Sequence, residues 1–91
     1  YAGARDNLGM TLVRQERLAE AAEQFEINIE QFQDFVSSHN NLGVVYFRLK
    51  EFGKARAQFE KTLELQPGHS SAQANLKLFT NESGAGIQLL Q

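Results

Sequence analysis

Three asparagines stand 34 residues apart and carry the clearest binding chemistry in the chain: Asn7, Asn41 and Asn75. A side-chain amide offers both donors and an acceptor, so it can pair with the backbone of a peptide whatever the peptide's sequence. On helices stacked at steps of about 10 Å, each step would match about three residues of extended chain at roughly 3.3 Å each. The same amides could instead tie one helix to the next inside the fold.

The two histidines are the candidates for a metal ligand or a general base, and their positions argue against both roles. His39 and His69 lie thirty residues apart, and neither has a second ligand at helical spacing. We expect His39 to pack between the first helices of successive helical hairpins, and His69 to lie in the loop after Pro67. The chain has no cysteine, which excludes disulfides and sulfur-ligated zinc. We therefore expect no metal site and no cofactor.

Serine, glutamate and glycine residues do not form a catalytic site either. The serines lack the glycine-flanked turn of a nucleophile, and we expect them to begin helices; they are Ser37, Ser38, Ser70 and Ser71. A row of glutamates shares one helix side, which is usually the solvated face; it comprises Glu20, Glu23, Glu26 and Glu30. The SGAG stretch from Ser83 lacks the flanking strand and helix of a phosphate loop. We expect no enzyme activity.

An internal repeat of 34 residues positions these side chains, with the exception of the SGAG stretch. Pairs that keep the offset include Arg14 and Arg48, Ala21 and Ala55, Gln24 and Gln58, and Phe25 and Phe59. Within each unit the apolar residues recur at helical spacing, which predicts an all-α chain. We expect helices at 4–15, 18–33, 37–49 and 52–66, the last ended by Pro67-Gly68. A fifth helix, capped by Ser70 or Ser71, is expected to run to about residue 80.

Two glycines fall in the middle of expected helices, where glycine costs ~1 kcal/mol relative to alanine. Gly9 and Gly43 are therefore expected to allow two helices of a hairpin to pack closely, opposite the small residues Ala21 and Ala55. Phe59 is expected to lie in the core.

The pattern resembles that of the tetratricopeptide repeat family over residues 2–80. It is carried by Leu42, Gly43, Tyr46, Phe52, Ala55, Phe59, Leu63 and Pro67, and less fully by Leu8, Gly9, Leu12, Leu18, Ala21, Phe25 and Ile29. The resemblance implies a right-handed superhelix of stacked helical hairpins, a helical-hairpin solenoid. In that family the first helices line a concave groove that binds peptides or partner proteins.

The resemblance also divides the chain into parts. A first repeat spans 2–35, a second 36–69, a capping helix 70–82 and a flexible apolar tail 83–91. No equivalent cap precedes Ala4, and the chain begins at Tyr1, so we expect a processed product or a piece of a longer protein with further repeats upstream. The tail is expected either to occupy an apolar groove, as a built-in ligand, or to be a frayed terminus.

The expected peptide-binding residues share one face of the first helices by their i, i+3, i+4 and i+7 spacing. They are Asn7, Met10, Arg14, Asn41, Val44, Phe47, Arg48 and Asn75. The apolar members, with Val13 and Leu78, form a strip, and the two arginines at its margin could take an acidic group. Family members that hold the terminal carboxylate of a chaperone use basic and asparagine side chains at five positions of the first helices, of which only Asn41 fits here; the five are Asp6, Met10, Asn41, Ser71 and Asn75. Those cations are missing, which disfavours such a ligand.

Composition narrows the class of partner. The 91 residues carry a net charge of -2, with 42% apolar and 22% charged residues, as expected for one soluble globular domain. This charge balance gives no positive electrostatic field that would attract nucleic acid. No stretch of the sequence approaches the ~18 consecutive apolar residues of a membrane-spanning helix. The absence of cysteine fits a reducing or an oxidising compartment, and we favour the cytoplasm.

The sequence therefore predicts a protein–protein interaction scaffold that binds a peptide or helix segment in a concave groove. Two alternatives remain open. One is a non-catalytic regulatory or targeting appendage of a larger enzyme. The other is a self-assembly element that associates through its repeat ends or its tail.

Overall fold

The computed structural model describes residues 1–80, which contain five α-helices and no strand. The helices are α1 (Ala2–Arg14), α2 (Leu18–Gln31), α3 (Val36–Arg48), α4 (Phe52–Leu65) and α5 (Ser70–Thr80). Their ends differ from the expected ones by at most two residues, so the predicted all-α hairpin fold is confirmed. The predicted tail 83–91 and the end of the predicted 70–82 segment lie outside the described residues.

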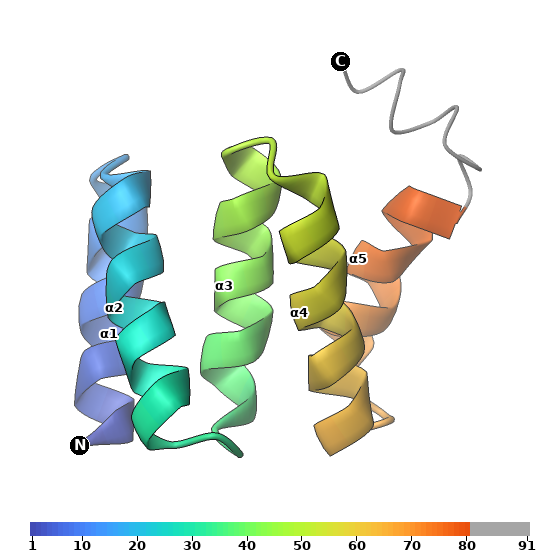
Figure 1. Ribbon diagram of the computed structural model, residues 1–91, viewed down its shortest axis with the longest axis horizontal. Helices are drawn as coiled ribbons and strands as arrows, with labels where there is room; N and C mark the ends of the chain where they lie inside the picture. The colour runs from blue at the N-terminus through green and yellow to red at the C-terminus, as the bar shows by residue number, and fades with distance from the viewer. Residues whose placement is uncertain (81–91) are drawn as a thin grey trace.

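The helices form a curved array with an inner and an outer side (Figure 1). Each helix packs on the next one along the chain. In addition, α1 contacts α3 and α3 contacts α5, whereas α2 and α4 do not approach each other closely. The array therefore bends with α1, α3 and α5 on its inner side. In Figure 1, α2 and α4 lie in front of α1 and α5.

The turn inside each hairpin repeats at the same 34-residue offset. Glu16 and Lys50 both have a left-handed backbone, with φ of 61° and 65°. After each of them the chain folds back on the preceding helix: the backbone N–H of Arg17 donates to the carbonyl of Leu12 at 2.9 Å. The equivalent bond in the second hairpin joins Glu51 to the carbonyl of Tyr46 at 2.8 Å. These bonds satisfy carbonyl groups that a helix end would leave unpaired.

The expected close packing at the two mid-helix glycines is confirmed, and its partner is an aromatic ring. A Cβ atom on Gly9 would lie 2.5 Å from the ring of Phe25, and one on Gly43 would lie 2.6 Å from the ring of Phe59. Both rings are buried, with Phe59 only 1% exposed. Ala21 and Ala55 are buried as well, but the rings occupy the space that the missing side chains leave.

Two local expectations, about the cap of α5 and about His39, need correction. His69 lies in the loop after Pro67 as expected, but it, rather than Ser70 or Ser71, caps α5: its Nδ1 accepts a hydrogen bond from the backbone N–H of Ala72 at 3.2 Å. His39 does not sit between first helices. Its Nδ1 lies 2.8 Å from Gln58 Oε1 in α4, and its Nε2 donates to the carbonyl of Gln33 at 2.8 Å.

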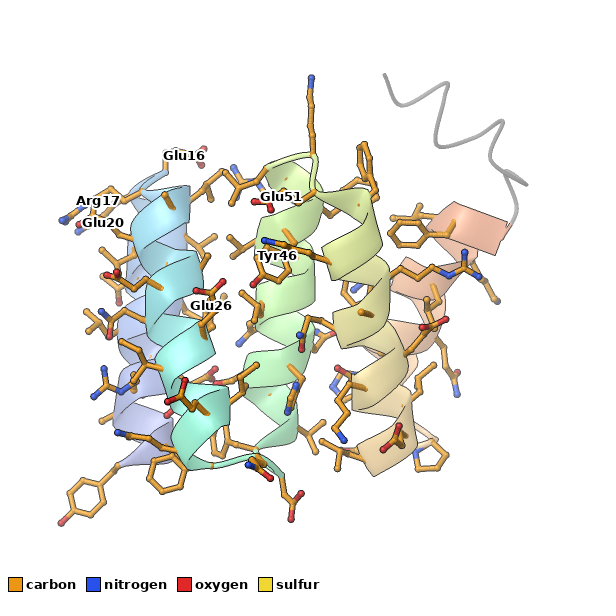
Figure 2. The ribbon with its side chains drawn as sticks, viewed as in Figure 1. Glu16, Arg17, Glu20, Glu26, Tyr46 and Glu51 are labelled. Carbon is orange, nitrogen blue, oxygen red and sulfur yellow. The ribbon has the colours of Figure 1, made fainter. Side chains whose placement is uncertain are left out.

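Tyr46 joins three helices on the outer side of the array (Figure 2). Its hydroxyl donates to the Glu26 carboxylate of α2, and the ammonium of Lys54 in α4 lies 5.5 Å from the centre of its ring. Tyr46 as a whole is 7% exposed. Burial, followed by the hydrogen bond and charge of Glu26, raises the pKa of Tyr46 well above its ordinary value of about 10.

The glycine contact generates a stability prediction. Gly43→Ala should lower the free energy of unfolding by ~1–3 kcal/mol, because the added methyl group overlaps the buried Phe59 ring and outweighs the better helix propensity of alanine. Gly53→Ala is the matched control, since nothing lies within 4 Å of the Cβ position there. It should be neutral or stabilise by up to ~1 kcal/mol. Urea unfolding measures both, and equal effects would contradict the assignment.

The raised Tyr46 pKa predicts a loss of stability in alkali. The Tyr46 hydroxyl stabilises the fold while it is protonated and neutral. Its contribution to the free energy of unfolding is therefore complete below pH ~10, and it falls by up to ~1.4 kcal/mol per pH unit as pH rises toward the folded-state pKa. Tyr46→Phe should cost ~1 kcal/mol at neutral pH. Its deficit relative to the unsubstituted chain should shrink above pH ~10. Denaturant unfolding at several pH values tests this, and a constant deficit would refute it.

Candidate functional site

The predicted binding residues lie on α1, α3 and α5, the three helices of the inner side. Equivalent positions recur at the 34-residue offset, giving an amide row and an apolar row on all three helices and a pair of arginines on α1 and α3. We call their surface the inner face. Its members are Asn7, Met10 and Arg14 on α1, Asn41, Val44 and Arg48 on α3, and Asn75 and Leu78 on α5.

The three asparagines of the amide row are not equivalent. Asn41 is half-buried, and its Nδ2 donates to Asp6 Oδ1 at 3.1 Å and to Ser37 Oγ at 3.3 Å. Asn41 therefore ties α3 to α1, one of the two roles the sequence left open, and its carbonyl oxygen remains as an acceptor. Asn7 is exposed and Asn75 half-buried, and neither makes such a bond to another described residue.

A buried polar cluster centred on Asp6 lies beneath the amide row. The Asp6 carboxylate is 8% exposed and accepts hydrogen bonds from Ser37 Oγ at 2.9 Å and Ser38 Oγ at 2.7 Å, in addition to Asn41. Ser38 in turn accepts from Asn28 Nδ2 of α2 at 2.7 Å. The cluster thus connects α1, α2 and α3, and every polar group that holds Asp6 is supplied by the second hairpin.

Sequence reasoning missed this cluster. Ser38 was expected to begin a helix, but it is fully buried inside α3. The cluster could have been found by comparing residues 34 positions apart that occupy the same place in successive units. Ser38 corresponds to Ala72 of α5, which is also fully buried. A polar residue at a position that is apolar in the next unit requires a buried partner.

The apolar row is partly consumed by packing within the fold. Met10 and Val44 are half-buried against the core, and Leu78 is 40% exposed. Phe47, which we also expected to bind a ligand, packs edge-on against Phe52 at 5.1 Å and Phe79 at 5.7 Å between ring centres. Much of its ring therefore serves contacts between α3, α4 and α5.

The two arginines differ in their partners. Arg48 Nη2 lies 2.7 Å and 2.9 Å from the two carboxylate oxygens of Glu16, in the turn of the first hairpin. Arg14 donates to Thr11 Oγ1 at 3.1 Å and forms no ion pair with another described residue. An acidic ligand group would have to compete with Glu16 at Arg48, so Arg14 is the more available cation.

No three histidine or acidic side chains among residues 1–80 stand close enough to hold a metal ion. None of the described helices has the length and apolar character needed to cross a membrane.

Comparison with known proteins agrees with the helical repeat. A family model for the tetratricopeptide repeat matches residues 7–70, which include most of the first hairpin and all of the second. No curated protein matches the chain significantly.

The Asp6 cluster generates a prediction that separates structure from binding. Asp6→Ala should lower the free energy of unfolding by ~2–3 kcal/mol, because it leaves the buried hydroxyl of Ser38 without its acceptor. Asn7→Ala is the matched control on the same helix, and it should change stability by less than ~0.5 kcal/mol because Asn7 is exposed. Thermal or urea unfolding measures both. Similar losses for the two variants would show that the cluster does not stabilise the fold.

Proposed function

The chain belongs to the tetratricopeptide repeat family, and on that premise we propose that it binds a peptide or helical segment of another protein on its inner face. Repeats of this family are non-catalytic and generally mediate protein–protein interaction. The observation that supports the inner face is that α1, α3 and α5 present the same kinds of side chain at the same positions. A ligand that crosses the three helices would meet an amide and an apolar side chain at each step.

The contacts suggest what such a ligand would look like. Met10, Val44 and Leu78 favour apolar ligand side chains about three residues apart if the segment is extended. The side chains of Asn7 and Asn75 can both donate and accept hydrogen bonds to a ligand. Asn41 already donates to Asp6 and Ser37, so toward a ligand it can only accept. The central step of the ligand should therefore offer a backbone N–H.

Charge contributes less to this proposed recognition than the sequence suggested. Arg48 is paired with Glu16, and that pair is exposed to solvent. An acidic side chain of the ligand that replaced Glu16 would therefore add little to the binding free energy. Arg14 remains as the cation for an acidic residue at one end of the ligand. We therefore expect a largely neutral, apolar segment with at most one important acidic side chain.

A peptide selected from a random displayed library against the immobilised chain tests this proposal. Leu78→Asp should weaken binding of that peptide about tenfold, because it places a charge in the apolar row, and Asn75→Ala should weaken it about fivefold. Glu23→Ala, on the exposed outer surface of α2, is the control and should leave affinity unchanged. Fluorescence polarisation gives the affinities, and melting temperatures check the fold. Selected peptides that bind both inner-face variants as well as the unsubstituted chain would contradict the proposal.

A further inference from the structure

The inner face contains two joints, one between α1 and α3 and one between α3 and α5, with similar polar side chains at equivalent positions. In the first joint Ser37 and Asn41 of α3 both donate hydrogen bonds to the Asp6 carboxylate of α1. Their 34-residue counterparts in the second joint are Ser71 and Asn75 on α5, with Asn40 of α3 in the place of Asp6. The second joint therefore has the same two donor residues as the first, but an amide in place of the carboxylate.

The hydrogen bonds of the first joint are not repeated in the second. Among residues 1–80, no side-chain hydrogen bond involves Asn40, Ser71 or Asn75. The Oδ1 atom of Asn40 is buried without a donor, although buried polar atoms are normally paired. Ser71 is exposed and Asn75 is half-buried, so both side chains are accessible to a bound molecule. The second joint thus keeps open the polar groups that the first joint uses internally.

The second joint is held together by apolar packing instead. The ring of Phe79 on α5 packs against Phe47 of α3 and Phe59 of α4, at 5.7 Å and 6.3 Å between ring centres. The buried position that Ser38 occupies in the first joint is occupied here by Ala72. A ligand can therefore bond to Ser71 and Asn75 without breaking a hydrogen bond of the described fold.

Free hydroxyl and amide groups on a binding surface favour a ligand whose main chain is accessible. A serine hydroxyl and an asparagine amide each donate and accept, and a peptide group of an extended chain offers one N–H and one C=O. In a helical ligand those main-chain groups are already bonded within the helix. A helix lying on Ser71 and Asn75 would remove them from water without pairing them, which is unfavourable. The second joint therefore favours an extended segment.

We propose that the bound segment is extended and that its main chain is held at the second joint, by Ser71 and Asn75 beside Asn40. This inference rests on the proposed function and narrows it, because it selects an extended peptide over a helix. It also places the main-chain contacts on one side of the inner face. At the first joint the ligand meets side chains already bonded to Asp6, where the Asn41 oxygen remains as an acceptor.

The two serines at equivalent positions test this placement with the peptide selected from the displayed library. Ser71→Ala should weaken binding about fivefold and leave the melting temperature unchanged, because one hydrogen bond to the ligand is lost. Ser37→Ala is the matched control, since Ser37 is also exposed and also lies in the first turn of its helix. It should lower the melting temperature by about 4 °C and leave affinity unchanged, because its hydroxyl serves Asp6.

Equal effects of the two serine variants on affinity would overturn the inference. Leu78→Asp separates this result from a failure of the proposed function. If it still weakens binding of the same peptide, the inner face binds the ligand but does not hold its main chain at the second joint. A library that yields no binder would contradict both the proposed function and this inference.

Backbone N-methylation of the selected peptide, one residue at a time, tests the ligand side. Each methyl group removes one N–H donor and keeps the side chains. At one position or more it should weaken binding to the unsubstituted chain about tenfold, but binding to Ser71→Ala or Asn75→Ala by at most about twofold. Circular dichroism of the mixture should show no gain in helix. A peptide that becomes helical on binding, or N-methyl effects that are the same for every variant, would refute the proposal.

Discussion

The fold depends on one contact that the chain makes twice, a phenylalanine ring lying on a glycine of the facing helix. Phe25 on Gly9 and Phe59 on Gly43 fix how closely the two helices of each hairpin approach. A hairpin built this way still has an apolar side that it cannot bury alone, so the hairpins must stack. The inner and outer layers, and hence the surface available to a partner, follow from this packing.

The two joints between successive units use different chemistry. Between the first and second hairpins, the joint contains the Asp6 cluster and the bond from Tyr46 to Glu26. At the end of the array, α5 is held by the rings of Phe79, Phe59 and Phe47. Directional hydrogen bonds fix the register of the first joint because few arrangements satisfy every buried group. The aromatic joint instead gains stability from buried apolar area.

The sequence was sufficient for the helices and for the close approach at the two glycines, though not for the phenylalanine ring as the partner, because both features are encoded within one unit and repeated in the next. Phe59 was placed in the core from its spacing alone and is 1% exposed. The Asp6 cluster and the Arg48–Glu16 pair were not predictable in the same way. Both join residues 31–35 positions apart whose pairing depends on how the hairpins stack. Periodicity identifies the face on which a residue lies, but not which polar atom on the neighbouring helix it meets.

Because α2 and α4 do not contact each other, the outer side of the described array is held together through α3. The outer helices can change their separation only by shifting on α3, on which both of them pack extensively, whereas the inner helices touch one another directly. Tyr46 spans this gap, held by Glu26 on one side and lying under Lys54 on the other, and so limits how far it opens. A segment bound across α1, α3 and α5 would add contacts along the inner side, where the helices touch one another less extensively than they touch α2 and α4.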